Sequence, residues 1–336
     1  MRIETICDNV KKGIFSNPSC KQEVVFGPVP SRRLGHSLGI NNIQFKTCSY
    51  NCVYCQVGRT TRLSVCREAC LDPHELFCVA KRKVDSLKEQ GVEVDYISFT
   101  PQGEPTLDLR LSTHIRLLRE FGYKVAVFTN SSLLWNNTVQ EDLLFADYVS
   151  VKIDTVREET WHTLNRPHRR LRFDVVLDGL ADFSNAYRGV LTTETMLVRN
   201  MNDTAEELKA LAEYLNDVRR AKSYFSIPVR PPAEPFALAP DPCSLSEISS
   251  LVSTEIPNSV LLSLPEELDF EGTGDTEEAL LGILSVHPMN EQAVRQFLRH
   301  RGSRLNTIQE MIRRKTIRKV RFNGKTFYQR ERADRH

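Results

Sequence analysis

The sequence predicts an α/β fold: a partial (β/α)6 parallel barrel followed by a small C-terminal domain of helices and a hairpin. Apolar, strand-like runs alternate with helix-length amphipathic segments over the first two thirds of the chain, which indicates right-handed parallel crossovers. Polar motifs recur just after these runs, where parallel α/β folds gather their chemistry. A proline-rich run near residue 240 then separates this pattern from a short, basic segment.

The composition is that of a globular protein. With 336 residues, of which 40% are hydrophobic, the chain is long enough for one large domain and a small one. Its nine cysteines are odd in number and three are clustered, which favours a reducing cytosol over a secreted disulfide framework. Residues 1–15 lack the apolar core of a signal peptide, and no stretch is long enough to span a bilayer. We therefore expect a cytoplasmic protein without membrane partners.

The first part of the predicted barrel leads into a cysteine loop. Residues 1–25 show no periodicity and are predicted to be an N-terminal extension. Prolines and glycines predict a loop over Phe26–Gly35, and the alternating run Ser37–Phe45 predicts the first strand. After the cysteines, Asp72 has the features of a helix N-cap, followed by Pro73 at the first helical position, and the helix is expected to reach Lys88.

Strands and helices then alternate five more times. The expected strands are Tyr96–Phe99, Lys124–Phe128, Tyr148–Ile153, Val190–Val198 and Tyr224–Ile227. The expected helices are Leu109–Phe121, a short helix before Ala146, Phe173–Phe183, and a helix opened by Asp203 with Glu206 in the capping position.

Polar motifs follow five of these strands. They are Thr100–Pro105, Thr129–Ser132, Lys152–Asp154, Arg199–Asp203 and Pro228–Pro232. Each motif alone would be an ordinary turn, loop, helix cap or linker. Their repetition at one edge of the sheet, after a cysteine loop, predicts a functional site there.

The cysteine loop places Cys48, Cys52 and Cys55 within eight residues, with Tyr54 just before the last cysteine. A four-iron cluster held by three cysteines keeps one iron free, whereas a closed structural zinc site needs four protein ligands. The alternative on the loop alone is therefore a zinc knuckle completed by Cys66 or Cys70.

Beyond the barrel, the chain predicts a linker and a separate domain. Residues 243–275 are expected to form a linker with a connecting helix at Leu245–Val252, and residues 276–336 a basic domain. This domain contains three predicted helices, Glu277–Val286, Glu291–His300 and Leu305–Arg314, then strands Thr316–Phe322 and Lys325–Arg330 joined by the turn Asn323-Gly324. Three helices and a hairpin resemble a winged helix.

The net charge of +2 conceals a basic C-terminus. From Glu291 to His336 there are 14 Lys or Arg against 4 Asp or Glu. The third helix and the hairpin carry Arg313, Arg314, Arg318, Lys319, Arg321 and Lys325. Such a surface suits a phosphate backbone; the alternatives are a solvated basic face, a protein-contact domain or a lid.

Residues from about Phe26 to Asp241 resemble the core of the radical S-adenosylmethionine (SAM) superfamily, which gives a predicted core of residues 26–242. The motifs are similar to those of the wyosine-synthase-like, tRNA-modifying group. These motifs are Gly27–Arg33, the cysteine loop, Gly103–Thr106, Asn165–His168 and Arg230–Pro232.

This resemblance implies a cofactor arrangement. Cys48, Cys52 and Cys55 would bind a [4Fe-4S] cluster, and the amino and carboxylate groups of SAM would chelate its fourth iron. The SAM contacts implied are Gln102, Gly103, Glu104, Thr129, Asn130, Ser131, Lys152, Asn200 and Tyr54, with the strand Tyr224–Pro228 against the adenine. Gln102 stands where the family has a glycine, which leaves backbone contacts available.

The implied reaction is reductive cleavage of SAM to a 5′-deoxyadenosyl radical that abstracts hydrogen from a substrate, with a nucleotide in tRNA as the leading substrate. An electron donor similar to flavodoxin or ferredoxin, and RNA held by the basic domain, are the expected partners. The alternatives are a radical SAM enzyme acting on a small metabolite or peptide, and a non-catalytic zinc-containing nucleic-acid-binding protein.

The other cysteines bear on which reaction is expected. Wyosine synthases carry a second cluster held by N-terminal cysteines and a lysine that engages pyruvate, but only Cys7 and Cys20 precede the loop here, so the wyosine reaction itself is not expected. Cys66, Cys70 and Cys78 could form an auxiliary site. We favour a structural role for them, because the spacing of Cys66 and Cys70 suits one helical face.

Overall fold

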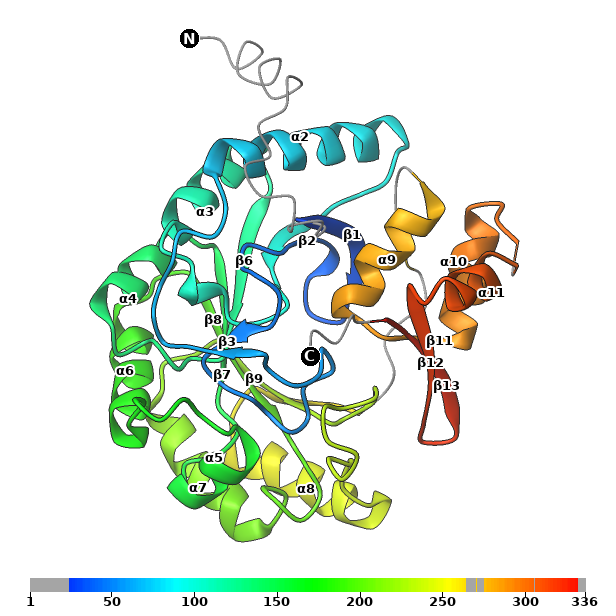
Figure 1. Cartoon of the computed structure of the whole chain (residues 1–336). Helices are drawn as coiled ribbons and strands as arrows, with labels where there is room; N and C mark the ends of the chain where they lie inside the picture. The colour runs from blue at the N-terminus through cyan, green and yellow to red at the C-terminus, as the bar shows by residue number, and fades with distance from the viewer. Residues whose placement is uncertain (1–23, 264–269, 271–274, 305, 332–336) are drawn as a thin grey trace.

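The computed structural model of the chain describes residues 24–263, 270, 275–304 and 306–331. The predicted N-terminal extension lies almost wholly outside the described residues. Figure 1 shows a twisted sheet inside an arc of helices, with the C-terminal elements forming a smaller body beside it. None of the described helices is long and apolar enough to cross a bilayer.

The main sheet confirms the predicted parallel α/β fold. Its eight strands run in the order β1-β2-β5-β6-β7-β8-β9-β10, and every neighbouring pair is parallel except β1 with β2. The strands are β1 Val25–Ser31, β2 Gly35–Ile40, β5 Tyr96–Phe99, β6 Lys124–Thr129, β7 Tyr148–Lys152, β8 Val190–Met196, β9 Lys222–Ser226 and β10 Ser259–Leu262. A short pair, β3 Thr47–Cys48 and β4 Arg62–Leu63, flanks the cysteine loop.

Helices cover the outside of this sheet (Figure 1). They are α2 Pro73–Glu89, α3 Leu111–Arg119, α4 Asn137–Leu143, α5 Glu158–Leu164, α6 Phe173–Ala186, α7 Ala205–Asp217 and α8 Pro242–Glu255, with a 3-10 turn at Pro105–Leu107. In α2 the Asp72 side chain accepts from two backbone N–H groups as predicted, and Leu76, Ala80, Val84 and Leu87 form the face buried against the core. Each buried Leu or Val of this face contributes roughly 1.5 to 3 kcal/mol.

The predicted loop at Phe26–Gly35 is wrong for most of its length, because Val25–Ser31 forms strand β1. Pro28 and Pro30 lack a backbone N–H, which argued against a strand. An edge strand tolerates them, since β1 pairs only with β2 and its register is irregular between Phe26 and Val29.

Three further details differ from the sequence-based expectations. The cap of α7 is Thr204, whose side chain accepts from Glu207 N, while Asp203 accepts from Asn200 N instead. Helix α5 was not predicted. The parallel sheet also continues past residue 242, where we expected the core to end, because β10 pairs with β9. Strand β10 has only four residues, Ser259–Leu262, and so short a run gives too little periodicity to reveal an edge strand.

The C-terminal elements form a unit with its own apolar core. Helices α9 Thr276–Val286, α10 Glu291–His300 and α11 Asn306–Arg313 pack on a three-stranded antiparallel sheet of β11 Met289–Asn290, β13 Lys325–Arg330 and β12 Ile317–Phe322. The predicted Asn323-Gly324 turn has positive φ at both residues, as a type I′ hairpin requires. Helix α9 packs against β1. The winged-helix assignment and the domain boundaries other than the one at residue 242 stay predictions.

Candidate active site

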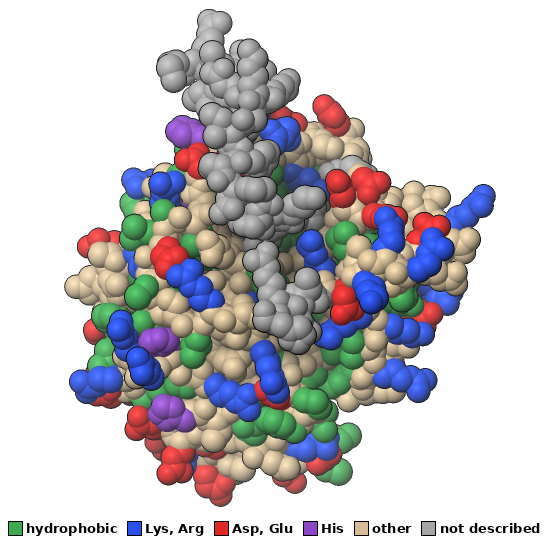
Figure 2. Space-filling view, in the orientation of Figure 1, with side chains coloured by type: hydrophobic (Ala, Val, Ile, Leu, Met, Phe, Trp, Pro, Cys, Tyr) green, Lys and Arg blue, Asp and Glu red, His purple; other side chains and the backbone are tan. Residues whose placement is uncertain are grey.

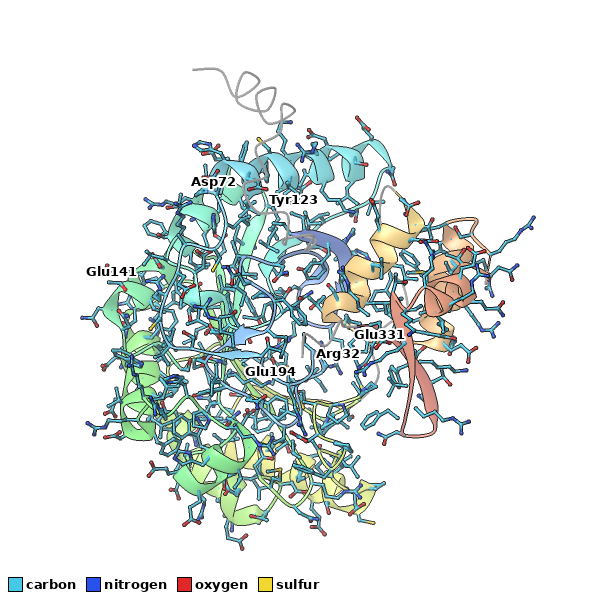
Figure 3. All side chains as sticks on the ribbon, viewed as in Figure 1. Arg32, Asp72, Tyr123, Glu141, Glu194 and Glu331 are labelled. Carbon is cyan, nitrogen blue, oxygen red and sulfur yellow. The ribbon has the colours of Figure 1, made fainter. Side chains whose placement is uncertain are left out.

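A cavity of about 400 Å³ opens where the parallel strands end. Its walls come from the cysteine loop, the ends of strands β5 to β9, the turn between β1 and β2, and residues Val286 and His287 at the end of α9. Figure 3 labels Glu194 and Arg32, both lining residues, in the middle of the molecule and inside the arc of helices. Four of the five predicted strand-end motifs therefore meet at this cavity, whereas Arg199–Asp203 contributes no lining residue.

The cysteine loop is held by backbone hydrogen bonds from two sides. Lys46 N donates to Gln102 O at 3.1 Å, and Glu104 N donates to Thr47 O at 3.2 Å, which ties the loop to the segment after β5. On the other side Val53 N donates to Leu164 O at 3.0 Å. These contacts fix the path of the loop, and all three cysteine thiols line the cavity.

Each of the three sulfur atoms has one side-chain N–H donor. Asn130 Nδ2 lies 3.5 Å from Cys48 Sγ, Asn165 Nδ2 lies 3.4 Å from Cys52 Sγ, and Lys46 Nζ lies 3.5 Å from Cys55 Sγ. Such donors stabilise a sulfur that carries negative charge.

Burial raises the pKa of two of these thiols. The pKa of Cys48 lies above its usual value because of burial and the nearby charge of Glu104. Burial and Asp154 raise the pKa of Cys52 to about 12. Without a metal these thiols stay protonated at neutral pH, so metal binding there releases protons.

Glu104 presents a firmly held carboxylate to the cavity. Its Oε1 accepts from Thr106 N at 3.0 Å, Thr106 Oγ1 at 2.6 Å and Thr129 Oγ1 at 2.6 Å, and its Oε2 accepts from Asn130 N at 2.7 Å. Burial raises the pKa of Glu104, and these four donors oppose that effect. Because Oε2 has a single donor, Asn130 N, among the residues that the structure describes, it has capacity for a ligand N–H.

Gly103 allows the segment after β5 to pack directly on the cysteine loop. A Cβ atom at this position would lie 2.0 Å from Thr47 O and 2.7 Å from Ile43 Cδ1. Only glycine fits such a close approach between two backbone segments.

The structure brings most of the predicted SAM-contact residues together, but not all. Tyr54, Gly103, Glu104, Thr129, Asn130 and Lys152 line the cavity. Gln102 is buried, and its backbone donates to Asn41 Oδ1 and accepts from Lys46 N. The Asn200 backbone N–H donates to Asp203 Oδ1. Ser131 lines a separate small cavity beside Asp154. Gln102, Asn200 and Ser131 are therefore not placed in the cavity wall, and the SAM contacts of the other six stay predictions.

Comparison with known proteins identifies the family. Residues 43–215 match the model of the radical SAM superfamily, and this segment contains the three cysteines, Glu104 and most of the cavity wall. The chain belongs to the radical SAM superfamily. It is an enzyme, as are the radical SAM proteins among its structural neighbours.

Two UPF0026 proteins are similar to this chain in sequence. A UPF0026 protein of Methanocaldococcus jannaschii is 39% identical over 307 residues, covering 91% of this chain and 95% of that protein. A UPF0026 protein of Helicobacter pylori is 31% identical over 211 residues, covering 62% of this chain and 67% of that protein. The chain thus also belongs to the UPF0026 family.

Solved structures show the same fold at low identity. A radical SAM methyltransferase from Sphaerobacter thermophilus aligns with a TM-score of 0.54 and 17% identity, covering 68% of this chain and 66% of that one. TYW1 with a lysine-pyruvate adduct bound aligns with a TM-score of 0.50 and 12% identity, covering 66% of this chain and 74% of that one. At such identities the likeness concerns the fold alone.

The radical SAM core also contains a charged network that the sequence did not reveal. Glu194 on β8 accepts from Arg33 Nη1 at 2.8 Å and Ser226 Oγ at 3.1 Å, and Lys152 Nζ lies 3.6 Å away. Burial alone would raise the pKa of Glu194, but the charges of Arg33 and Lys152 hold it well below its usual value. The signal that the sequence offered was Glu194 as the one acidic residue in the strand-like run Val190–Val198. The structure places it beside Lys152 in the register of the sheet.

A second cluster, just after the end of β7, supports the cysteine loop; the sequence indicated its residues but not their mutual contacts. Tyr54 OH donates to Asp154, and Asn165 Nδ2 lies 2.7 Å from Asp154 Oδ2. Asp154 also accepts from Met196 N at 2.8 Å. The carboxylate thereby joins the cysteine loop to two strand ends, which explains why Asp154 is buried.

The remaining described cysteines lie away from this site. The predicted helical face for Cys66 and Cys70 is wrong, because both lie in an extended segment before α2, whereas Cys78 is buried within α2. None of these three lines the cavity. Among the described residues no three His, Cys, Asp or Glu side chains are close enough together to hold a single metal ion. The zinc-knuckle alternative therefore gains no support from the structure.

Proposed function

We propose that this radical SAM enzyme holds a [4Fe-4S] cluster with Cys48, Cys52 and Cys55 and binds SAM at the iron that has no protein ligand. The observation that carries the proposal is the meeting of three thiols and the Glu104 carboxylate on one cavity of about 400 Å³. When bound and reduced, the cluster would supply the electron that splits SAM into methionine and a 5′-deoxyadenosyl radical, which takes hydrogen from the substrate.

The residues present fit such a cluster. Soft thiolates suit iron–sulfur chemistry, and three of them leave one iron open. A four-iron cluster also spreads its cysteine ligands farther apart than a single ion does, in keeping with three thiols that line one cavity without converging on one point. The three N–H donors stand where the negative charge of the sulfurs would need them.

The chain's own residues bind and enclose the cofactor. Glu104 Oε2, oriented by Asn130, would accept from the SAM ammonium group. Lys152, at the end of β7 on the same edge of the sheet, suits a carboxylate or a ribose oxygen. Val286 and His287 reach the cavity from the C-terminal unit, where they would limit the entry of water. A reactive radical requires that water be excluded.

Anaerobic reconstitution tests this proposal. The native protein should bind about four iron and four sulfide per chain, and after reduction with dithionite it should release 5′-deoxyadenosine from SAM. Changing Cys48, Cys52 or Cys55 to Ala should abolish both. Cys243, which is exposed on α8, provides the matched control, and Cys243→Ala should leave both unchanged. A protein that binds one zinc and no iron would refute the proposal.

For the substrate we propose a nucleotide in RNA, with a flavodoxin- or ferredoxin-like protein as electron donor. The favouring observation is that the basic unit borders the cavity. Its hairpin exposes Arg318, Lys319, Arg321 and Lys325, and Lys and Arg side chains gather over this unit in Figure 2. The same unit contributes Val286 and His287 to the cavity wall. RNA bound to the hairpin would thus lie close to the reacting centre.

RNA binding can be tested by its salt dependence. Changing Arg318, Lys319 and Arg321 together to Gln should weaken binding of bulk tRNA and reduce the slope of log K against log salt by roughly 2 to 3, because each phosphate contact contributes about 0.7 to 0.9. The control changes three exposed lysines of the main body, Lys88, Lys124 and Lys209, to Gln. Equal effects of the two triple variants, or no tRNA binding at all, would favour a small metabolite or peptide as substrate.

A further inference from the structure

Lys46 is a lysine whose side chain is fully buried beside the cysteine loop. Its exposed fraction is 1%, and its Nζ lies 3.5 Å from Cys55 Sγ. Nothing in the radical SAM reaction as described above uses this residue. Burying an ammonium group costs a great deal of free energy unless a negative charge compensates it. The position of Lys46 therefore needs an anionic partner.

The backbone directs Lys46 towards the sulfurs. Lys46 has a φ of 51°, which an ordinary residue adopts only when its surroundings impose it. Its N–H donates to Gln102 O, and its carbonyl accepts from Thr61 N at 3.2 Å and Arg62 N at 3.1 Å. The backbone is thus anchored on both sides, and the side chain reaches Cys55 Sγ at the wall of the cavity.

No carboxylate forms an ion pair with Lys46 among the described residues, and its hydrogen-bond acceptor there is Cys55 Sγ. Its charge also acts on Cys48, whose thiolate form it favours. Two of the three proposed cluster ligands therefore face this ammonium group. The anion that compensates Lys46 is supplied by the thiolates and whatever they hold.

Lys46 differs from the two other N–H donors. Asn130 Nδ2 also lies 2.8 Å from Ser49 Oγ, and Asn165 Nδ2 lies 2.7 Å from Asp154 Oδ2, so both amides have additional protein acceptors. Both are also neutral. Lys46 alone of the three donors brings a full positive charge, and a charged donor stabilises an anionic acceptor about twice as strongly as a neutral one.

We infer that Lys46 sets the reduction potential of the cluster by placing a buried positive charge against the Cys55 and Cys48 thiolates. This inference rests on the proposed function. Reduction adds one negative charge to the cluster, and a fixed cation at its sulfur favours the reduced form. The role follows from the charge of the side chain, while a hydrogen bond alone would supply only a smaller part of the effect.

The test is a redox titration of reconstituted protein without SAM, in which the reduced cluster is measured by electron paramagnetic resonance. Lys46→Gln keeps an N–H donor but removes the charge, Lys46→Met removes both, and Lys46→Arg keeps the charge. At the potential where the native cluster is half reduced, we expect the ratio of reduced to oxidised cluster to fall at least tenfold in Lys46→Gln and Lys46→Met. In Lys46→Arg the ratio should stay within about threefold of the native value. Lys124→Gln, at the exposed start of β6, is the matched control and should behave as native.

Iron and sulfide analysis keeps the two proposals distinguishable. A native protein that assembles no cluster contradicts the proposed function itself. Full cluster content with an unchanged ratio in Lys46→Gln and Lys46→Met overturns the inference about Lys46. Circular dichroism checks that Lys46→Gln and Lys46→Met fold. If both fold but hold no iron, while Lys46→Arg holds iron, the need for a cation is supported. If all three variants lose iron equally, Lys46 has only a packing role.

Discussion

At the scale of single residues, Gly103 determines how closely the segment after β5 approaches the cysteine loop. The Cβ of Gly103→Ala would lie 2.0 Å from Thr47 O, and that atom belongs to backbone that cannot easily move. We expect the variant to lose most of its reconstituted iron and roughly 1 to 3 kcal/mol of unfolding free energy. Iron analysis and urea denaturation measure both effects.

The matched control for this substitution is Gly122→Ala. Gly122 has a φ of +82°, but a Cβ there meets no atom within 4 Å. Its substitution should cost about 1 kcal/mol through backbone strain and leave the iron content intact. Equal iron loss in both variants would show that the close approach at Gly103 does not position the loop.

Glu194 gives a prediction about pH. Because its folded pKa lies below the ordinary value of 4.5, its stabilising effect is present above about pH 4.5 and is lost as the pH falls below that value. At pH 7, the free energy of unfolding of Glu194→Gln should be roughly 3 kcal/mol lower than that of the native protein, since Arg33 and Lys152 are left without their counter-charge.

Urea denaturation of native protein and Glu194→Gln at pH 7 and pH 4 would check this sign. The difference between the two proteins should shrink at the lower pH, because the Glu194 carboxylate of the unfolded chain takes up a proton there while that of the folded protein stays ionised. Glu158→Gln, at an exposed position on α5, should show little difference at either pH. If the loss of unfolding free energy in Glu194→Gln grows as the pH falls, the lowered pKa assigned to Glu194 is contradicted.

At the scale of elements, the end of α9 is fastened to the cysteine loop. Gln56 Nε2 donates to Val286 O at 3.0 Å, and Arg230 Nη1 donates to Gln56 Oε1 at 3.0 Å. Gln56→Ala removes both hydrogen bonds, each of which contributes about 0.5 to 1.5 kcal/mol. The cavity should then open more often.

Thiol alkylation measures this opening. In metal-free protein, peptide mass spectrometry should show Cys48, Cys52 and Cys55 of Gln56→Ala reacting roughly 2 to 10 times faster than in native protein, which corresponds to losing the one hydrogen bond that joins Gln56 to Val286 of α9. Exposed Cys243 serves as the internal reference within each sample. Gln90→Ala at the exposed end of α2 is the control variant, and identical rates in Gln56→Ala would mean that α9 does not restrict access.

The elements that sequence predicted well are those whose local signals agree with their packing. Helix α2 combines an Asp72 cap, a proline at the first position and a regular apolar face. Strand β1 was missed because its prolines argue locally against pairing, and only the neighbouring strand β2 decides that it pairs. Strand β11 was missed because two residues carry no periodicity at all.

At the scale of the whole molecule, the apolar residues form separate main and C-terminal cores. Both tryptophans of the chain, Trp135 and Trp161, lie in the main body. Tryptophan fluorescence therefore reports the unfolding of that body, whereas far-ultraviolet circular dichroism reports both.

This division predicts the effect of a cavity in the C-terminal core. Phe297 is fully buried there, and Phe297→Ala should cost about 3 to 5 kcal/mol. In urea denaturation, the loss should appear as a circular dichroism transition that begins at a lower urea concentration, with the midpoint of the fluorescence transition nearly unchanged. A matched main-body variant, Phe183→Ala, should shift the fluorescence midpoint. Equal fluorescence shifts in both variants would show that the two cores unfold as one.

The sequence by itself determined the fold class, the order of the parallel strands along the chain and the three cysteines on one loop, because periodicity, caps and ligand spacing are local properties. It also indicated Glu104, Thr129, Asn130 and Lys152, since strand ends meet at one edge of a parallel sheet.

Only the tertiary structure decided which polar groups face one another. The Lys46 ammonium beside Cys55, the Arg33–Glu194–Lys152 network and the contact of Val286 with Gln56 join residues whose sequence positions carry no common signal. A single charged side chain gives no periodic pattern, and whether it is buried depends on packing that brings distant segments together. For that reason the sequence could show that the three cysteines share one loop, which the structure places on the cavity, while it could not show the charges around them.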